Sequence, residues 1–125
     1  MKMTRRIIAA LAVALCAGPA VAASTCNVKE YSDVGVSLNN STIQVALEPG
    51  VADQTPIDFS SGHAESLAFN VATRFIEVIC NTQASYLIGA TPVATNLNSW
   101  IPAGISKFMG IPKGKGYKIS VVANP

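Results

Sequence analysis

Short runs of β-forming residues, separated by residues typical of turns, make up most of the sequence after its first two dozen positions. No long stretch of this part has the 3.6-residue periodicity of an amphipathic helix. The runs are TIQVAL (42–47), TPIDF (55–59), SLAFN (66–70), TRFIEVIC (73–80), SYLIGA (85–90), KFMGI (107–111) and YKISVV (117–122). Seven or eight short strands at such spacing predict an all-β fold, namely a compact antiparallel β-sandwich or a small barrel.

The segment TRFIEVIC (73–80) is largely apolar on both of its faces. In an extended strand, one face carries Phe75, Glu77 and Ile79. The other face carries Arg74, Ile76, Val78 and Cys80. Because both faces are mostly apolar, we expect this strand to take a central position in a two-layer structure.

The N-terminal segment has the three parts of a secretory signal. MKMTRR (1–6) is basic, IIAALAVALCAG (7–18) is uncharged and apolar, and PAVAAS (19–24) supplies small residues at the minus-three and minus-one positions of a cleavage site. The apolar run is short for a membrane span, and Leu15 precedes Cys16 where a lipoprotein signal needs a small residue. The pattern predicts a cleaved helical signal peptide, residues 1–23, with cleavage after Ala22 or Ala23 and no stable membrane anchor afterwards.

The mature chain, residues 24–125, is long enough for one β-sandwich domain with a single core. The full chain has 9 basic and 7 acidic residues. Three of the basic residues belong to the signal, so six remain against seven acidic ones and the net charge is near −1. Such a balance gives little support for nucleic-acid binding, and the signal predicts a secreted or periplasmic location.

Cysteine use agrees with export. Removal of the signal takes Cys16 away and leaves Cys26 and Cys80, an even pair in an oxidising compartment. A metal site built from these two cysteines and His63 is the alternative, but the number and spacing of ligands are poor for zinc. We therefore predict a Cys26–Cys80 disulfide and no metal.

The segment DFSSGHAES (58–66) gathers the side chains of a hydrolase within a few positions. Catalytic triads, however, are assembled from separate rigid elements beside an oxyanion hole, and a Ser-Ser-Gly turn between two strands accounts for the same residues. Asp53 and Asp58 lack the dense oxygen-ligand spacing of a calcium loop. We expect no catalytic residue, no cofactor and no metal, and hence a protein that is not an enzyme.

The segment PKGKGY (112–117) allows two interpretations, an anion-binding loop or a turn. A phosphate-binding loop needs glycines that follow a strand and open a helix, whereas the strand pattern KISVV follows here, which favours the turn. Trp100, beside the Pro-Ala-Gly turn, is either a lid on the core or an exposed contact residue, and the sequence leaves both open. Lys113, Lys115, Lys118 and Trp100 are therefore the predicted surface-contact residues.

Three segments resemble one group of proteins. They are VKEYSDVG (28–35), the segment from LEPG to VATN (47–96), and WIPAGISKFMGIPKGKGYKISVV (100–122). This order of turns and strands is similar to that of small proteins encoded among the virion structural genes of tailed phages and prophages. The resemblance implies a compact β-sandwich that decorates or helps to build a phage particle, with virion components or further copies of itself as partners.

The signal and the cysteine pair indicate a second class of function. Virions assemble in a reducing cytoplasm, whereas an exported chain with a disulfide is typical of a secreted or periplasmic protein. The alternative is therefore a secreted or periplasmic β-sandwich binding module, adhesin-like or envelope-associated, that uses exposed loops. In either case the expected mode of action is contact with protein partners.

Processing is the first testable outcome. Because a signal peptidase cuts after small residues, the exported protein should begin at Ala23 or Ser24, and its intact mass should be lower by two hydrogens owing to the Cys26–Cys80 bond. Mass spectrometry of periplasmic protein measures both. A retained Met1, or two thiols that react with an alkylating agent without prior reduction, would contradict this expectation.

Overall fold

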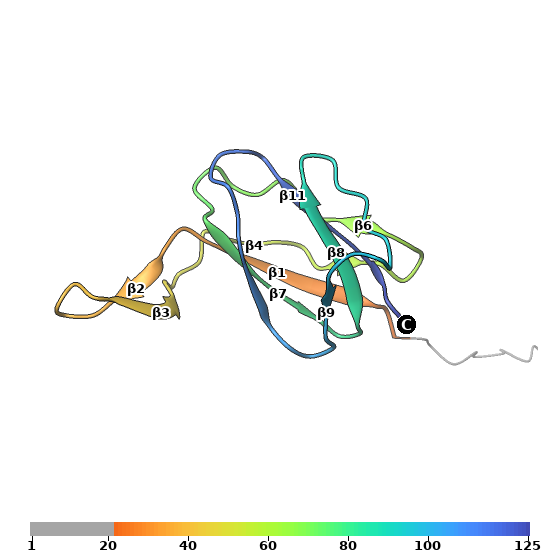
Figure 1. Ribbon diagram of the computed structural model, residues 1–125, viewed down its shortest axis with the longest axis horizontal. Helices are drawn as coiled ribbons and strands as arrows, with labels where there is room; N and C mark the ends of the chain where they lie inside the picture. Colours follow the sequence, from red (N-terminus) through yellow and green to blue (C-terminus); the bar gives the residue numbers. More distant parts are fainter. Residues whose placement is uncertain (1–21) are drawn as a thin grey trace, which may run out of the picture.

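A computed structural model describes residues 22–125 of the protein and shows an all-β fold in that range (Figure 1). The predicted signal peptide, residues 1–23, lies almost wholly outside the described residues. Residues 22–125 form eleven short strands rather than the seven or eight expected. They are β1 (Thr25–Tyr31), β2 (Val34–Val36), β3 (Thr42–Ala46), β4 (Ala52–Asp53), β5 (Ile57–Asp58), β6 (Ala64–Glu65), β7 (Phe75–Cys80), β8 (Ala84–Gly89), β9 (Trp100–Ile101), β10 (Lys107–Gly110) and β11 (Lys118–Ala123).

The strands form three antiparallel sheets. The first has the order β10-β7-β1-β4, and β5 also pairs with β1. The second has the order β6-β11-β8-β9, and the third is the hairpin β2-β3. The position of β7 between β1 and β10 confirms the expectation that residues 73–80 lie inside a sheet.

The two larger sheets share one hydrophobic core. Its buried residues come from β1, β5 and β7 of the first sheet, from β8, β9 and β11 of the second, and from the connecting segments. They are Cys26, Val28, Ile57, Phe59, Phe69, Ile76, Val78, Cys80, Ala84, Ile101, Ile111, Ile119 and Val121. In β7 the alternate residues Ile76, Val78 and Cys80 are the buried ones, which is the two-residue periodicity of a strand with one face toward the core.

The predicted disulfide is present. Cys26 and Cys80 are bonded, both are buried, and they occupy directly opposite positions on β1 and β7. The bond therefore joins two strands that are also paired at five further positions, up to Tyr31 opposite Phe75. It fastens the beginning of β1 to the end of β7 within the first sheet.

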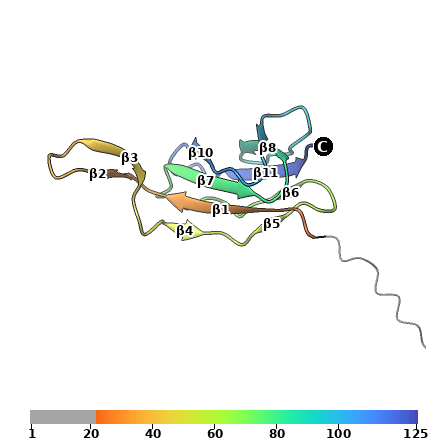
Figure 2. The ribbon, with the colours of Figure 1, turned by 90° about the horizontal axis from the view of Figure 1, so that it is seen from below.

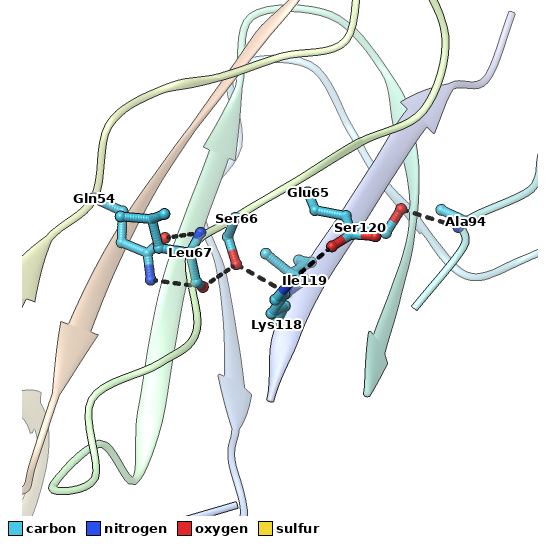
Figure 3. A network of polar contacts seen from close by, with 8 residues as sticks. All are labelled: Gln54, Glu65, Ser66, Leu67, Ala94, Lys118, Ile119 and Ser120. Carbon is cyan, nitrogen blue, oxygen red and sulfur yellow. Dashed lines mark hydrogen bonds and ion pairs between the residues drawn. The ribbon is translucent and has the colours of Figure 1, made fainter. Parts of the chain in front are cut away.

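Polar side chains link the first sheet to the segment after β6, and that segment to β11. Figure 3 shows that Gln54, from the loop after β4, accepts a hydrogen bond from the Leu67 N–H (2.9 Å), and that the Ser66 hydroxyl accepts one from the Ile119 N–H on β11 (3.0 Å). The Ser66 N–H donates in turn to the Ile119 carbonyl (2.8 Å). Nearby, Lys118 forms an ion pair with Glu65 at 3.1 Å.

The prediction that residues 66–70 form a strand is wrong, because β6 ends at Glu65. This segment still runs beside β11: the N–H groups of Ser66 and Phe69 donate to the carbonyls of Ile119 and Tyr117. The intervening N–H of Leu67 is bound by the Gln54 side chain instead of by a strand. Side-chain hydrogen bonds therefore replace part of the ladder that the apolar pattern predicted.

The hairpin β2-β3 extends from one end of the molecule. In Figures 1 and 2 it projects away from the two larger sheets, beyond the end of β1 that carries Tyr31. The opposite end of β1 carries the disulfide. The bulk of the fold therefore lies between a covalent link at one end and a projecting hairpin at the other.

The disulfide is expected to stabilise the domain measurably. It joins residues 54 positions apart, for which loop-closure entropy gives up to about 4 kcal/mol, and measured losses on removal are about 2–5 kcal/mol. Urea unfolding of the oxidised protein and of the same protein reduced by dithiothreitol should show this decrease in the free energy of unfolding. Reduction leaves all side chains in place, so equal unfolding free energies would show that the bond does not stabilise the fold.

Candidate functional site

The most unusual surface of the molecule is the projecting hairpin, which we call the arm (residues 34–47). Its two strands are joined by a tight turn in which the Ser37 N–H donates to the Ser41 carbonyl (2.8 Å) and the Asn40 N–H donates to the Ser37 carbonyl (2.9 Å). Asn40 has a positive φ of 61°, a conformation that asparagine adopts more readily than most residues. The turn places Leu38 at the tip of the arm.

The arm exposes apolar side chains on both of its faces. Val36 is opposite Thr42 in the register, so it shares a face with Thr42, whereas Ile43 and Val45 lie on the other face. The exposed fractions are 62% for Val36, 107% for Leu38, 41% for Ile43, 60% for Val45 and 47% for Leu47. An apolar patch of this kind, without a charged residue from position 34 to position 47, is typical of an interaction site.

A groove of about 670 Å³ lies between the arm and the first sheet. One side is formed by the arm and the residue that follows it (Val34, Gln44, Val45, Ala46 and Glu48). The other side is formed by β7 and β10 (Phe75, Phe108, Met109 and Gly110). Most of this lining is apolar, which is typical of recognition surfaces.

Aromatic rings form the wall of the groove on the side of the first sheet. Tyr31 and Phe75 are stacked with ring centroids 5.1 Å apart, and Phe108 lies against Phe75 at 6.5 Å with tilted planes. Tyr31 is buried, whereas Phe108 is 58% exposed. The outer ring of the row is thus available to a partner.

A polar cluster holds the base of the arm. The Glu48 carboxylate accepts hydrogen bonds from Lys29 Nζ (2.7 Å) and from the Gly50 N–H (2.9 Å). Gly50 is required here by close packing, because a Cβ atom at this position would lie 2.8 Å from the Glu30 carbonyl oxygen. The Tyr31 hydroxyl lies 3.3 Å from Glu48 Oε1 and 3.2 Å from Glu77 Oε2.

These contacts shift the pKa values of the cluster. The hydrogen bond between Lys29 and Glu48 raises the pKa of Lys29 and lowers the pKa of Glu48. The pair is therefore favourable above the ordinary pKa of glutamate, 4.5, and below that of lysine, 10.5. Burial, followed by the negative charge of Glu77, raises the pKa of Tyr31 to about 12.

The segment PKGKGY lies between β10 and β11. Gly114 and Gly116 have φ values of 69° and 61°, which glycine adopts without strain, and the strand β11 follows. Lys113 and Lys115 are exposed, whereas Lys118 is half-buried and paired with Glu65. The four predicted contact residues are thus not brought together: Trp100 lies on β9, at an edge of the second sheet.

Trp100 is half exposed, and its neighbour Ile101 fills the core instead. A shallow pocket of about 410 Å³ beside it is lined by Ser99, Trp100, Pro102, Ile105, Ser106 and Lys107. Lys107 Nζ donates to the Trp100 carbonyl (3.2 Å) and lies 4.8 Å from the centroid of the Tyr86 ring. Of the two interpretations of Trp100, the exposed position is the one that the structure has.

The two carboxylates of DFSSGHAES, Asp58 and Glu65, each pair with another side chain. Asp58 accepts hydrogen bonds from the hydroxyl of Ser60 (2.6 Å) and from its N–H (2.9 Å), and these bonds lower the pKa of Asp58. Glu65 is paired with Lys118, and His63 is exposed. Within residues 22–125 no group of three or more His, Cys, Asp or Glu side chains has the arrangement of a metal site.

In the same range, the chain forms no helix that is long and apolar enough to cross a membrane. Comparisons with protein-family models, with curated proteins and with solved structures gave no significant match. The site must therefore be interpreted from its own geometry.

The sequence alone does not identify the arm as a site. The alternation of Ile43, Val45 and Leu47 predicts a strand, and an apolar alternation ordinarily indicates a face that packs on the core. The missing information was spatial, because nothing in the local pattern shows that this hairpin extends beyond the body of the molecule.

Tyr31 should remain protonated to unusually high pH. A tyrosine whose folded pKa lies above its ordinary value of 10.0 stabilises the fold below pH 10, and this contribution is lost as the pH rises through about 12. Replacing Glu77 with Gln removes the second cause of the shift, so the Tyr31 pKa should fall but stay above 10.0 because burial persists. The difference in tyrosinate absorbance from the Tyr31→Phe protein isolates this step. An unchanged midpoint in Glu77→Gln would show that the Glu77 charge does not contribute.

Proposed function

We propose that the mature chain is a β-sandwich domain with a non-enzymatic structural or accessory role, and that it acts through contact between its surface and protein partners. The observation that carries this proposal is the arm, whose five apolar side chains are exposed beside an apolar groove. Exposure of such a patch is unfavourable for a protein that remains free in solution. A partner that covers the arm removes this apolar surface from water.

The resemblance to small virion proteins of tailed phages supports a role on a phage particle. Proteins that decorate particles need a compact domain and an attachment surface, and the arm with its groove is suited to be that surface. The exposed Lys113 and Lys115 and the half-exposed Trp100 are proposed as further contact residues.

A secreted or periplasmic binding module is the second candidate. The Cys26–Cys80 disulfide favours it, because such bonds persist in oxidising compartments. The same arm and groove would then bind an envelope or extracellular protein. Both candidates assign the same surface to partner contact, and they differ in location.

Location separates the two candidates. Cells that produce the full chain are divided into purified phage particles, periplasm and culture medium, and the chain is detected in each fraction by antibody. Retention on particles supports the virion role, and recovery of free protein in the periplasm or medium supports the binding module.

The groove beside the arm is tested in the same fractions with Phe108→Ser, which replaces its exposed ring. The matched control is Val93→Ser, because this apolar side chain is exposed to a similar degree, 55% against 58%, and lies outside the arm, the groove and the proposed contact residues. We expect the first change to reduce attachment to particles or envelope at least several-fold and the control to preserve it. Full attachment of Phe108→Ser would contradict a role of this surface in partner contact.

A further inference from the structure

We propose that the partner of this surface is a second copy of the chain, and that in a two-fold symmetric dimer the arm of each copy occupies the groove of the other. The inference rests on the proposed function in so far as it uses the same surface. It goes further because it specifies the occupant and the stoichiometry.

Residues 22–125 do not cover the arm. Apolar side chains lie on both of its faces, with Val36 on one face and Ile43 and Val45 on the other. The groove at the base of the arm contacts Val45 but not Val36 or Leu38. A body that packs against one face would leave the other face and the tip in water, so full burial requires another molecule.

The arm has the chemical character that the groove requires of an occupant. The occupant of the groove should be extended, apolar and uncharged, because Phe75, Phe108 and Val45 dominate the lining and its carboxylate, Glu48, is already neutralised by Lys29. The arm meets all three conditions, since it is a strand hairpin with no charged residue from position 34 to position 47. A charged partner would leave its own charges without counterparts in this groove.

Two strand edges beside the groove lack a strand partner. Within residues 22–125, β3 pairs only with β2, and β10 pairs only with β7, so each has one edge without a strand partner. Edges of this kind pair readily with a strand of another molecule. Gln44 to Ala46 of β3 and Phe108 to Gly110 of β10 line the same groove, so an incoming arm meets both edges.

The exposed apolar area of the arm and Phe108 is close to what a protein–protein interface buries. The exposed fractions of the five arm residues and Phe108 together equal almost four wholly exposed apolar side chains. At roughly 150–200 Å² for each, this is about 560–750 Å², close to the roughly 800 Å² per partner that a standard interface buries. Two-fold symmetry buries the same patch in both copies and closes the assembly at two.

The test is the mass of the full-length protein, purified with its disulfide intact, measured by sedimentation over a range of concentrations. The arm variant carries Val36→Ser, Leu38→Ser and Val45→Ser. The control variant carries Val71→Ser, Val93→Ser and Leu97→Ser, which are two valines and one leucine of comparable exposure (72%, 55% and 91%) outside the arm. All six side chains are exposed, so neither variant opens a cavity in the core, and circular dichroism verifies the fold.

We expect a dimer for the parent and for the control, and a monomer for the arm variant, with a dissociation constant raised on the order of 100-fold or more by the loss of three apolar contacts. The dimer should persist from low to high salt, because the arm carries no charge. A monomeric parent at all concentrations, a dimeric arm variant, a monomeric control or an assembly larger than two would each overturn the proposal.

The dimer and the attachment of this surface to particles or envelope can be contradicted independently of each other. If the parent is monomeric while Phe108→Ser still reduces attachment to particles or envelope, the second copy is excluded as the occupant and partner contact by the same surface stands. If the parent is dimeric and Phe108→Ser leaves attachment unchanged, the dimer is retained and attachment through this surface is excluded.

Discussion

The rest of the structure depends on a carboxylate buried in its central strand. Glu30 is almost fully buried in β1, where it accepts hydrogen bonds from Gln54 Nε2 (2.6 Å), from the Asn70 N–H (2.8 Å) and from the Thr73 hydroxyl. A buried carboxylate is costly unless it is fully hydrogen-bonded, so the three partners are held where Glu30 requires them. The loops after β4 and before β7 are thereby fixed to one strand.

The same residue explains why the sequence pattern does not predict the central strand. Cys26, Val28 and Glu30 occupy the buried face of β1, and a glutamate at the third position breaks the apolar alternation that would predict a strand. By contrast, TRFIEVIC and YKISVV have unbroken patterns, and they became β7 and β11 within one or two residues. The all-β class and the disulfide were predictable for the same reason, because both depend on residue type and local pattern alone.

The arm and the groove were not predictable in this way, since they depend on where segments far apart in the sequence meet. Val45 and Phe108 line one groove only because the hairpin leaves the body beside the end of β1 and because β10 pairs with β7. Gly50 and Glu48, which hold this arrangement, resemble ordinary turn residues in the sequence. Gly50 is needed because a Cβ atom at this position would lie 2.8 Å from the Glu30 carbonyl oxygen, and Glu48 forms an ion pair with Lys29.

The placement of the disulfide and the arm at opposite ends of β1 has a mechanical consequence. A pulling force on the arm acts along the axis of β1, and the six residue pairs that join β1 to β7 carry it in shear, all at the same time. Strands loaded in this direction resist separation far better than strands opened from one end, because the inter-strand hydrogen bonds lie across the force. At the far end of β1 the load reaches Cys26 and passes through a covalent bond to Cys80, so that the strand from which the arm extends is covalently anchored at its other end.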